Sequence, residues 1–203
     1  GIDITDAAAV RRFAEDSTHR LAQTIEDAAH ALKPELNVYH NGLAYRRQAN
    51  HIEIEVLPNG GWGYDYLPAA LHYARTLGKP VLTMAGRFQN TWGDVNGVRT
   101  EAAPEYDFLY SLAHGGWCSL GDHLPRHGQL HPEVYRRCGA VFRRIRELEP
   151  ELAGQQPVAE VLILDPVMRE FPEPLPTPEG DGWRLRSNLT GAVRLLSELK
   201  IQF

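Results

Sequence analysis

The sequence is poor in cysteine and contains no long apolar run. Cys118 and Cys138 are the only cysteines among its 203 residues. Two cysteines cannot make a disulfide framework, and their separation does not match a zinc-binding knuckle, so we expect reduced, buried thiols in a cytoplasmic protein. The longest apolar runs are too short to cross a bilayer, and no signal-peptide pattern opens the sequence, so we expect no membrane partner.

Basic stretches and nucleotide-binding motifs are also missing. The 21 Lys and Arg residues against 26 Asp and Glu residues give a formal charge of -5, with both signs mixed along the chain. No basic stripe alternates with aromatic residues, which argues against nucleic acid as a partner. The sequence lacks a phosphate-binding glycine loop, a serine-hydrolase elbow and a zinc-protease helix, so we expect no cofactor. A hydrophobic content of 43% and a charged content of 23% predict a soluble globular protein.

The sequence does contain an alternation of helical and strand patterns. Apolar residues recur at helical spacing between residues 6 and 32, with Asp6 as the expected N-cap and Pro34 just beyond the end. Further helices are predicted at 65–77, 104–114 and 131–148, and strands at 36–41, 51–56, 81–87 and 117–121. Alternation of this kind predicts an α/β fold with a parallel sheet.

A change in composition predicts a second domain. Residues 149–157 have the composition of a linker, and they are followed by an apolar strand at 158–164, a surface loop at 171–181 and a helix at 189–199. One strand and one helix cannot bury a core of their own. We therefore predict that residues 1–154 belong to one domain and that residues 155–203 begin another.

Polar and aromatic residues gather directly after the predicted strands of the first domain. They are His40, Asn41, Glu55, Trp62, Asp65, Arg87, Trp92, Asp94, Asp122 and His123. The connections that lead from helices back into strands, at 33–35, 78–80 and 115–116, are plain turns. A (β/α)8 TIM barrel builds its active site from the loops at the carboxyl ends of its strands, and an open doubly wound sheet uses the same edge. The pattern therefore predicts a site at this edge and favours part of a barrel.

Glu55 is the strongest catalytic candidate. In the strand 51–56, Ile52, Ile54 and Val56 alternate with two glutamates, so the apolar side chains can pack on helices while Glu53 and Glu55 face the barrel interior. A carboxyl group at the barrel mouth beside tryptophan can serve as a general acid. The alternative interpretation is a structural glutamate held by a basic side chain.

The segments 86–94 and 121–123 predict sugar recognition. Phe88 and Trp92 offer flat apolar faces to a pyranose ring, and the polar residues around them can bond its hydroxyl groups. The alternative is that the two aromatic residues only cap the core. Asp122 and His123 can bind substrate, hold a metal ion or form a structural clasp; no third metal ligand stands at a recognisable spacing.

Several of these motifs together resemble a bacterial family assigned as glycosyl hydrolases. The resemblance rests on residues 51–58, 60–65, 86–88, 92–94 and 121–124 and extends over nearly the whole chain. It implies an alpha-L-fucosidase-like barrel, followed from Pro157 by a domain similar to the beta-galactosidase trimerisation domain and to class I glutamine amidotransferases. It also implies that the catalytic nucleophile lies upstream of Gly1, with Glu55 as the partner carboxyl group. No cysteine nucleophile motif suggests amidotransferase activity.

The combined prediction is the C-terminal half of a (β/α)8 barrel followed by the start of an amidotransferase-like domain, in a retaining exo-glycosidase acting on fucoside- or galactoside-like carbohydrates. The expected partners are a carbohydrate substrate, the upstream half-barrel of the same protein and, as one option, further copies of the chain. Two alternatives stay open. One is a non-catalytic sugar-binding or assembly module, and the other is a metal-dependent barrel hydrolase or lyase that uses His40, Asp122 and His123.

Overall fold

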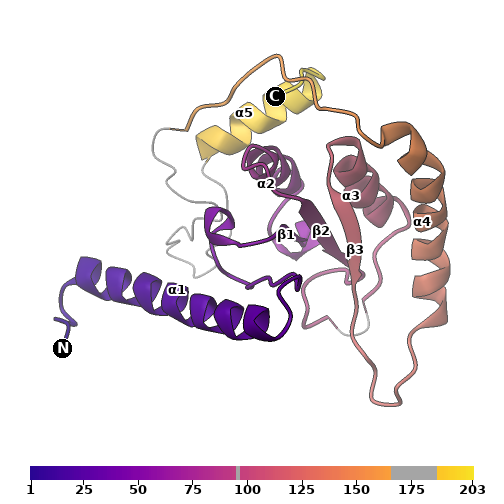
Figure 1. Ribbon diagram of the computed structural model, residues 1–203. Coiled ribbons are helices and arrows are strands. Elements are labelled where there is room, and N and C mark those ends of the chain that lie inside the picture. Colours follow the sequence, from indigo (N-terminus) through magenta and orange to yellow (C-terminus); the bar gives the residue numbers. More distant parts are fainter. Residues whose placement is uncertain (95–96, 166–186) are drawn as a thin grey trace.

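The computed structural model describes residues 1–94, 97–165 and 187–203. Within these ranges, three parallel strands form one sheet in the order β1-β2-β3: β1 Ile52–Val56, β2 Val81–Gly86 and β3 Trp117–Gly121 (Figure 1). The helices are α1 Ala7–Leu32, α2 Tyr66–Arg75, α3 Ala102–Ala113, α4 Pro132–Leu152 and α5 Ser187–Glu198. The predicted α/β class and the parallel order of these strands are confirmed, and closure of the sheet into a barrel stays a prediction.

The core lies between the sheet and its helices. On β1, Ile52 and Ile54 are fully buried and pack against α2, whereas Glu53 and Glu55, which alternate with them, are partly exposed on the other face. The predicted alternation along this strand is therefore confirmed. On β2, Ala85 packs with Phe108 of α3, and α4 covers α3 from the outside (Figure 1).

The strands are locked in register so that their carboxyl ends meet. Glu55 pairs with Met84, and Gly86 pairs with Gly121 across the second ladder. Parallel strands can only be joined by crossovers, which α2 and α3 supply here. The loops that follow the three strands are thereby brought to one edge of the sheet.

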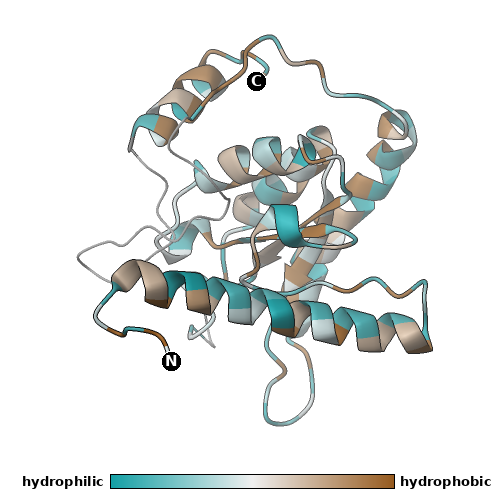
Figure 2. Ribbon diagram, turned by 60° about the vertical axis from the view of Figure 1, so that its left-hand side comes forward, coloured by the Kyte–Doolittle hydropathy of each residue, from teal (hydrophilic) through white to brown (hydrophobic). Residues whose placement is uncertain are grey.

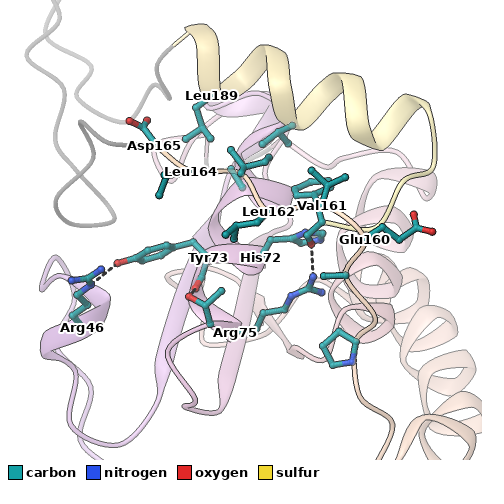
Figure 3. A pocket seen from close by; sticks show the side chains of 17 residues that line it. Arg46, His72, Tyr73, Arg75, Glu160, Val161, Leu162, Leu164, Asp165 and Leu189 are labelled. Carbon is teal, nitrogen blue, oxygen red and sulfur yellow. Dashed lines mark hydrogen bonds between the residues drawn. The ribbon is translucent and has the colours of Figure 1, made fainter.

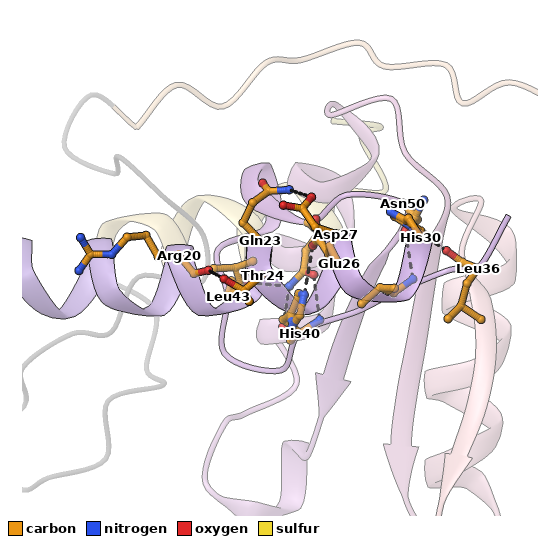
Figure 4. Close-up of polar contacts among 12 residues, drawn as sticks. Arg20, Gln23, Thr24, Glu26, Asp27, His30, Leu36, His40, Leu43 and Asn50 are labelled. Carbon is orange, nitrogen blue, oxygen red and sulfur yellow. Dashed lines mark hydrogen bonds and ion pairs between the residues drawn. The ribbon is translucent and has the colours of Figure 1, made fainter. Parts of the chain in front are cut away.

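Helix α1 has the predicted bounds and cap but packs over little of its length. The Asp6 carboxylate accepts hydrogen bonds from the backbone N–H of Ala8 (2.8 Å) and Ala9 (3.1 Å), as expected for an N-cap. Its apolar side chains remain mostly in solvent, with Leu21 62% and Leu32 90% exposed. Hydrophobic and hydrophilic residues alternate along the ribbon of this helix (Figure 2). Polar contacts hold its second half to the following segment (Figure 4).

The strand predicted at 36–41 is wrong, because this segment is extended but joins no ladder. The backbone N–H of Val38 donates to Asn50 Oδ1 at 3.0 Å, and that of His40 donates to Gln48 Oε1 at 3.1 Å. Side-chain acceptors therefore take the place of a neighbouring strand. A strand is defined by a neighbouring strand, and none of the described strands forms a ladder with this segment.

The strand predicted at 158–164 is also wrong in the described structure. The segment runs alongside α5 in an extended form (Figure 1), with Leu162 83% and Leu164 81% exposed. The backbone N–H groups of Glu160 and Val161 both donate to the carbonyl oxygen of Gln202. The apolar sequence favours a strand, but no described strand lies beside it.

The helix predicted to end at residue 148 is longer, because α4 continues through Pro150 to Leu152 and so includes the first residues of the predicted linker. A proline in the last turn removes few helical bonds, and the backbone N–H of Ala153 still donates to the carbonyl oxygen of Glu149 at 2.9 Å. The loop predicted at 171–181 lies outside the described residues. The division into two domains stays a prediction. No helix in the described ranges combines the length and the apolar character needed to span a membrane.

Candidate active site

A cavity of about 430 Å³ opens on the face of β1 that carries the glutamates. Of the predicted site residues, Asn41, Glu55, Trp62 and Trp92 line it. Its other lining residues are Tyr39, Gly42, Leu43, Tyr45, Glu53, Leu57, Tyr66 and Thr91. Carboxyl groups, hydroxyl groups and indole rings thus face one hollow, which is the mixture expected of a carbohydrate site.

Glu55 and Trp92 are in direct contact across this cavity. The indole Nε1–H of Trp92 donates a hydrogen bond to Glu55 Oε1. Trp92 belongs to the loop after β2, where its ring packs against Phe88 (centroids 4.9 Å apart) and stacks on His123 (5.9 Å, interplanar angle 23°). Glu55 and Trp92 therefore meet at the carboxyl ends of the strands as predicted, whereas Arg87 and Asp122, which were expected in the same concavity, do not line it.

Three tyrosines surround the two glutamates, and the sequence analysis missed all of them. Burial, and after it the nearby carboxylates of Glu53 and Glu55, raises the pKa of Tyr39 to about 12. Burial likewise raises the pKa values of Tyr45 and Tyr66, each of which is 3% exposed. All three hydroxyl groups thus stay protonated at neutral pH. Tyr39 donates to the backbone carbonyl of Glu53 at 3.1 Å. The available signal was the pair of tyrosines at 39 and 45 on either side of Asn41.

Arg87 and Asp122 form a buried ion pair at the ends of β2 and β3. Arg87 Nε donates to Asp122 Oδ1, and each side chain is only 6% exposed. Arg87 Nη1 also donates to the carbonyl oxygen of Gly97 at 2.9 Å, and Asp122 Oδ1 accepts the backbone N–H of His123 at 2.7 Å. Of the three roles considered for Asp122, these contacts favour the structural clasp, which fixes the residue that stacks on Trp92.

The remaining predicted residues are engaged elsewhere. His40 Nε2 lies 3.1 Å from Glu26 Oε1 and anchors α1 (Figure 4). Asp65 pairs with Arg194 of α5. The Asp94 carboxylate accepts the backbone N–H groups of Asn90 (3.1 Å) and Gly97 (3.0 Å), and so shapes the loop that carries Trp92. None of these three predicted residues lines the cavity.

The described ranges contain no group of three or more His, Cys, Asp or Glu side chains placed to hold a metal ion. His40, Asp122 and His123, which the metal-dependent alternative requires, have separate partners. His40 lies against α1, Asp122 is paired with Arg87, and His123 packs on Phe88 with ring centroids 4.5 Å apart. The structure thus does not gather these three residues into one centre.

A second cavity, of about 660 Å³, lies between α2, the extended segment 157–165 and α5 (Figure 3). None of the predicted site residues lines it. Burial, followed by the charges of Arg75 and His114, lowers the pKa of His72 to about 3, so this histidine is neutral at physiological pH. At the rim, Arg46 Nε donates to the Tyr73 hydroxyl at 2.9 Å. Apolar side chains such as Val161 and Leu189 make up much of the remaining wall.

No family model matches the chain, and a comparison with curated proteins gives no match. A comparison with solved structures gives alpha-L-fucosidase isoenzyme 2 from Paenibacillus thiaminolyticus, with 31% sequence identity and a TM-score of 0.83 over 99% of this chain. The chain is similar to part of a fucosidase. It spans 31% of the length of that enzyme's chain.

This similarity supports the coarser part of the predicted resemblance. A fucosidase-like glycoside hydrolase fold agrees with both the sequence identity and the structural overlap. The trimerisation-like domain, the bacterial origin and the half-barrel stay predictions.

Proposed function

We propose that this chain carries the acid/base side of the active site of a retaining exo-glycosidase that acts on fucoside- or galactoside-like carbohydrates. The observation that carries the proposal is the contact between Glu55 and Trp92 in a cavity that Trp62 also lines. A carboxyl group between indole rings combines a proton donor with apolar surfaces for a sugar. Similarity to an alpha-L-fucosidase supports the same class of reaction.

In this mechanism Glu55 protonates the glycosidic oxygen as the bond to the leaving group breaks. A second carboxylate, which the family resemblance implies lies upstream of Gly1, attacks the sugar and forms the covalent intermediate. Glu55 then removes a proton from the incoming water. Tyr39 and Asn41 at the cavity wall have hydroxyl and amide groups suited to the sugar hydroxyls. Trp62, packed edge to face on Tyr66 with centroids 5.0 Å apart, supplies a rigid apolar wall.

The test is Glu55→Gln in the full-length protein, assayed on two glycosides. On a substrate with a poor leaving group, activity should fall by about 10²- to 10⁴-fold, because general acid catalysis contributes about that much. An aryl glycoside with a good leaving group needs little protonation, so its glycosylation step should be much less affected. Added azide should restore turnover, since a small anion attacks the intermediate without a general base.

Glu105→Gln is the matched control, because it makes the same chemical change on a carboxylate that is exposed on α3 and paired with Arg144. It should leave both activities unchanged. Equal losses on both substrates in Glu55→Gln, with no rescue by azide, would assign Glu55 to binding or structure. Wild-type protein that binds the sugar but hydrolyses neither substrate would favour the non-catalytic sugar-binding module instead.

A further inference from the structure

We propose that Trp92 is the positioning residue of Glu55, and that Gly121 at the end of β3 is the position that admits the Trp92 ring. The inference rests on the proposed role of Glu55 as acid/base. It adds two residues whose effect on the reaction runs through that carboxyl group. It also links the end of β3, which does not line the cavity, to the reaction.

A hydrogen bond joins Trp92 directly to the carboxyl group of Glu55. Trp92 Nε1–H donates to Oε1 of Glu55 and so fixes one of the two carboxyl oxygens. A glutamate side chain on a strand otherwise rotates about its terminal bonds. Holding one oxygen sets the plane of the carboxyl group, and this plane determines where the second oxygen delivers its proton. The indole N–H has no acceptor character, so this orientation cannot be reversed by exchange of donor and acceptor.

Neighbouring side chains support the indole ring. Phe88 packs on it from the same loop, and His123 stacks on it from the segment after β3. The backbone of His123 is fixed by its hydrogen bond to Asp122, which is paired with Arg87. The ring that holds Glu55 is therefore itself held by a buried ion pair at the ends of β2 and β3.

The Trp92 ring lies close to Gly121. A Cβ atom at position 121 would overlap Cη2 of the Trp92 ring and would lie 3.1 Å from Cζ2, which is tighter than ordinary van der Waals contact. Gly121 is buried, so the added methyl group cannot turn into solvent. Because Phe88 and His123 also pack on the ring, it must move away from Gly121, and the hydrogen bond to Glu55 must move with it.

The test compares Gly121→Ala and Trp92→Phe in the full-length protein. A displacement of about 1 Å at a reacting group costs about 100-fold in rate, so kcat on the poor-leaving-group substrate should fall by about that factor in both variants. KM should change little, because phenylalanine keeps an aromatic face and Gly121 lies outside the cavity. For the good-leaving-group substrate kcat/KM, which reports the glycosylation step, should be affected much less. Gly139→Ala on α4 is the matched control: its Cβ would lie 3.6 Å from Arg143 Nη1, an ordinary contact, so activity should be unchanged.

A double variant separates positioning from a general structural defect. If Trp92 acts through Glu55, adding Trp92→Phe to Glu55→Gln should cause no further loss of activity. If the two residues act independently, the fold-losses of the two single variants should multiply in the double variant. The indole N–H resonance of Trp92 in nitrogen-15 NMR gives a readout that needs no activity, and it should shift in Glu55→Gln. A resonance that does not move, or losses that multiply, would overturn the inference.

The two proposals fail in different ways. Full activity in Glu55→Gln would remove the proposed function and the positioning role with it. A strong loss in Glu55→Gln together with wild-type kcat in Gly121→Ala and Trp92→Phe would overturn the positioning role alone. Equal losses of kcat/KM on both substrates in Gly121→Ala would also count against it, because kcat/KM reports the glycosylation step, in which only the poor leaving group needs the proton.

Discussion

Removal of the Asp122 carboxylate tests whether the pair at the ends of β2 and β3 is a clasp or a ligand-binding site. Arg87 and Asp122 are each 6% exposed, so the pair belongs to the buried class of ion pairs. In Asp122→Ala the Arg87 guanidinium stays buried and loses its carboxylate, and the backbone N–H of His123 loses its acceptor. Breaking a buried pair from one side costs about 3–5 kcal/mol of folding free energy.

Urea denaturation of the full-length protein measures this loss. At slopes of about 1–3 kcal/mol per molar urea, the midpoint should fall by about 1 M or more. Replacing both residues with apolar side chains of similar size, as in Arg87→Met with Asp122→Leu, should cost less than Asp122→Ala, because no unpaired charge remains. Glu105→Ala breaks an exposed pair with Arg144, at 58% and 43% exposure, and should cost about 1 kcal/mol or less.

The clasp interpretation would be refuted by a particular combination of results. If the free energy of unfolding of Asp122→Ala lies within about 1 kcal/mol of the wild-type value but the variant loses affinity for the sugar, Asp122 binds substrate. If the double apolar variant is no more stable than Asp122→Ala, the penalty does not come from a stranded charge. This measurement therefore decides between the structural role and the substrate-binding role of Asp122.

Three further results are expected. Phe108→Ala should lower the free energy of unfolding by about 3–5 kcal/mol in urea, because Phe108 is fully buried between β2 and α4; a loss below 1 kcal/mol would contradict this packing. Asp6→Ala should cost about 0.5–2 kcal/mol of helix stability and reduce helical circular dichroism, and an unchanged spectrum would mean that the cap is not formed in solution. Burial lowers the pKa of His72 from its ordinary 6.5 to about 3, so between these values the unfolded chain binds a proton that the folded chain does not. Stability should therefore fall as pH decreases from 6.5, and His72→Phe should show a smaller fall between pH 7 and 5 than wild type; equal falls would exclude this source.

Local patterns were sufficient to predict most of the sheet and its helices. The alternation in β1 has a period of two over the whole strand, and the same residues that are apolar in sequence are buried in the structure. The cap at Asp6 and the proline after Leu32 fixed both ends of α1. These features depend on residues close in sequence, so one chain without relatives is enough to reveal them.

The two wrongly predicted strands show what a local sequence pattern cannot predict. Residues 36–41 and 158–164 have strand composition, but a strand also needs a neighbour in space. Val38 instead finds its acceptor in the side chain of Asn50, and Glu160 finds its acceptor in the carbonyl oxygen of Gln202. Neither partner is visible from the composition of the segment, because both are chosen by tertiary structure.

The same limit explains the mixed outcome for the site residues. Position after a strand predicted that Glu55 and Trp92 would share one edge, and that edge follows from the parallel order alone. Asp65 also follows a strand and a loop, yet it pairs with Arg194, which lies 129 residues later in the chain. Whether a side chain after a strand lines the cavity or forms an ion pair depends on which charged residue, distant in sequence, lies next to it in the fold. Its position after the strand does not predict this.

Strand β1 carries residues for stability on one face and residues for the proposed chemistry on the other. Ile54 points into the core against α2, and Glu55, the next residue, points into the cavity toward Trp92. Because side chains alternate along a strand, a slip of one residue in register would bury both glutamates and expose the isoleucines. The free energy of burying Ile52 and Ile54 therefore also fixes the face on which Glu55 stands. A substitution at Glu55 then acts on the cavity with little effect on the core, so a loss of activity there reflects a change in the cavity and not a loss of folding.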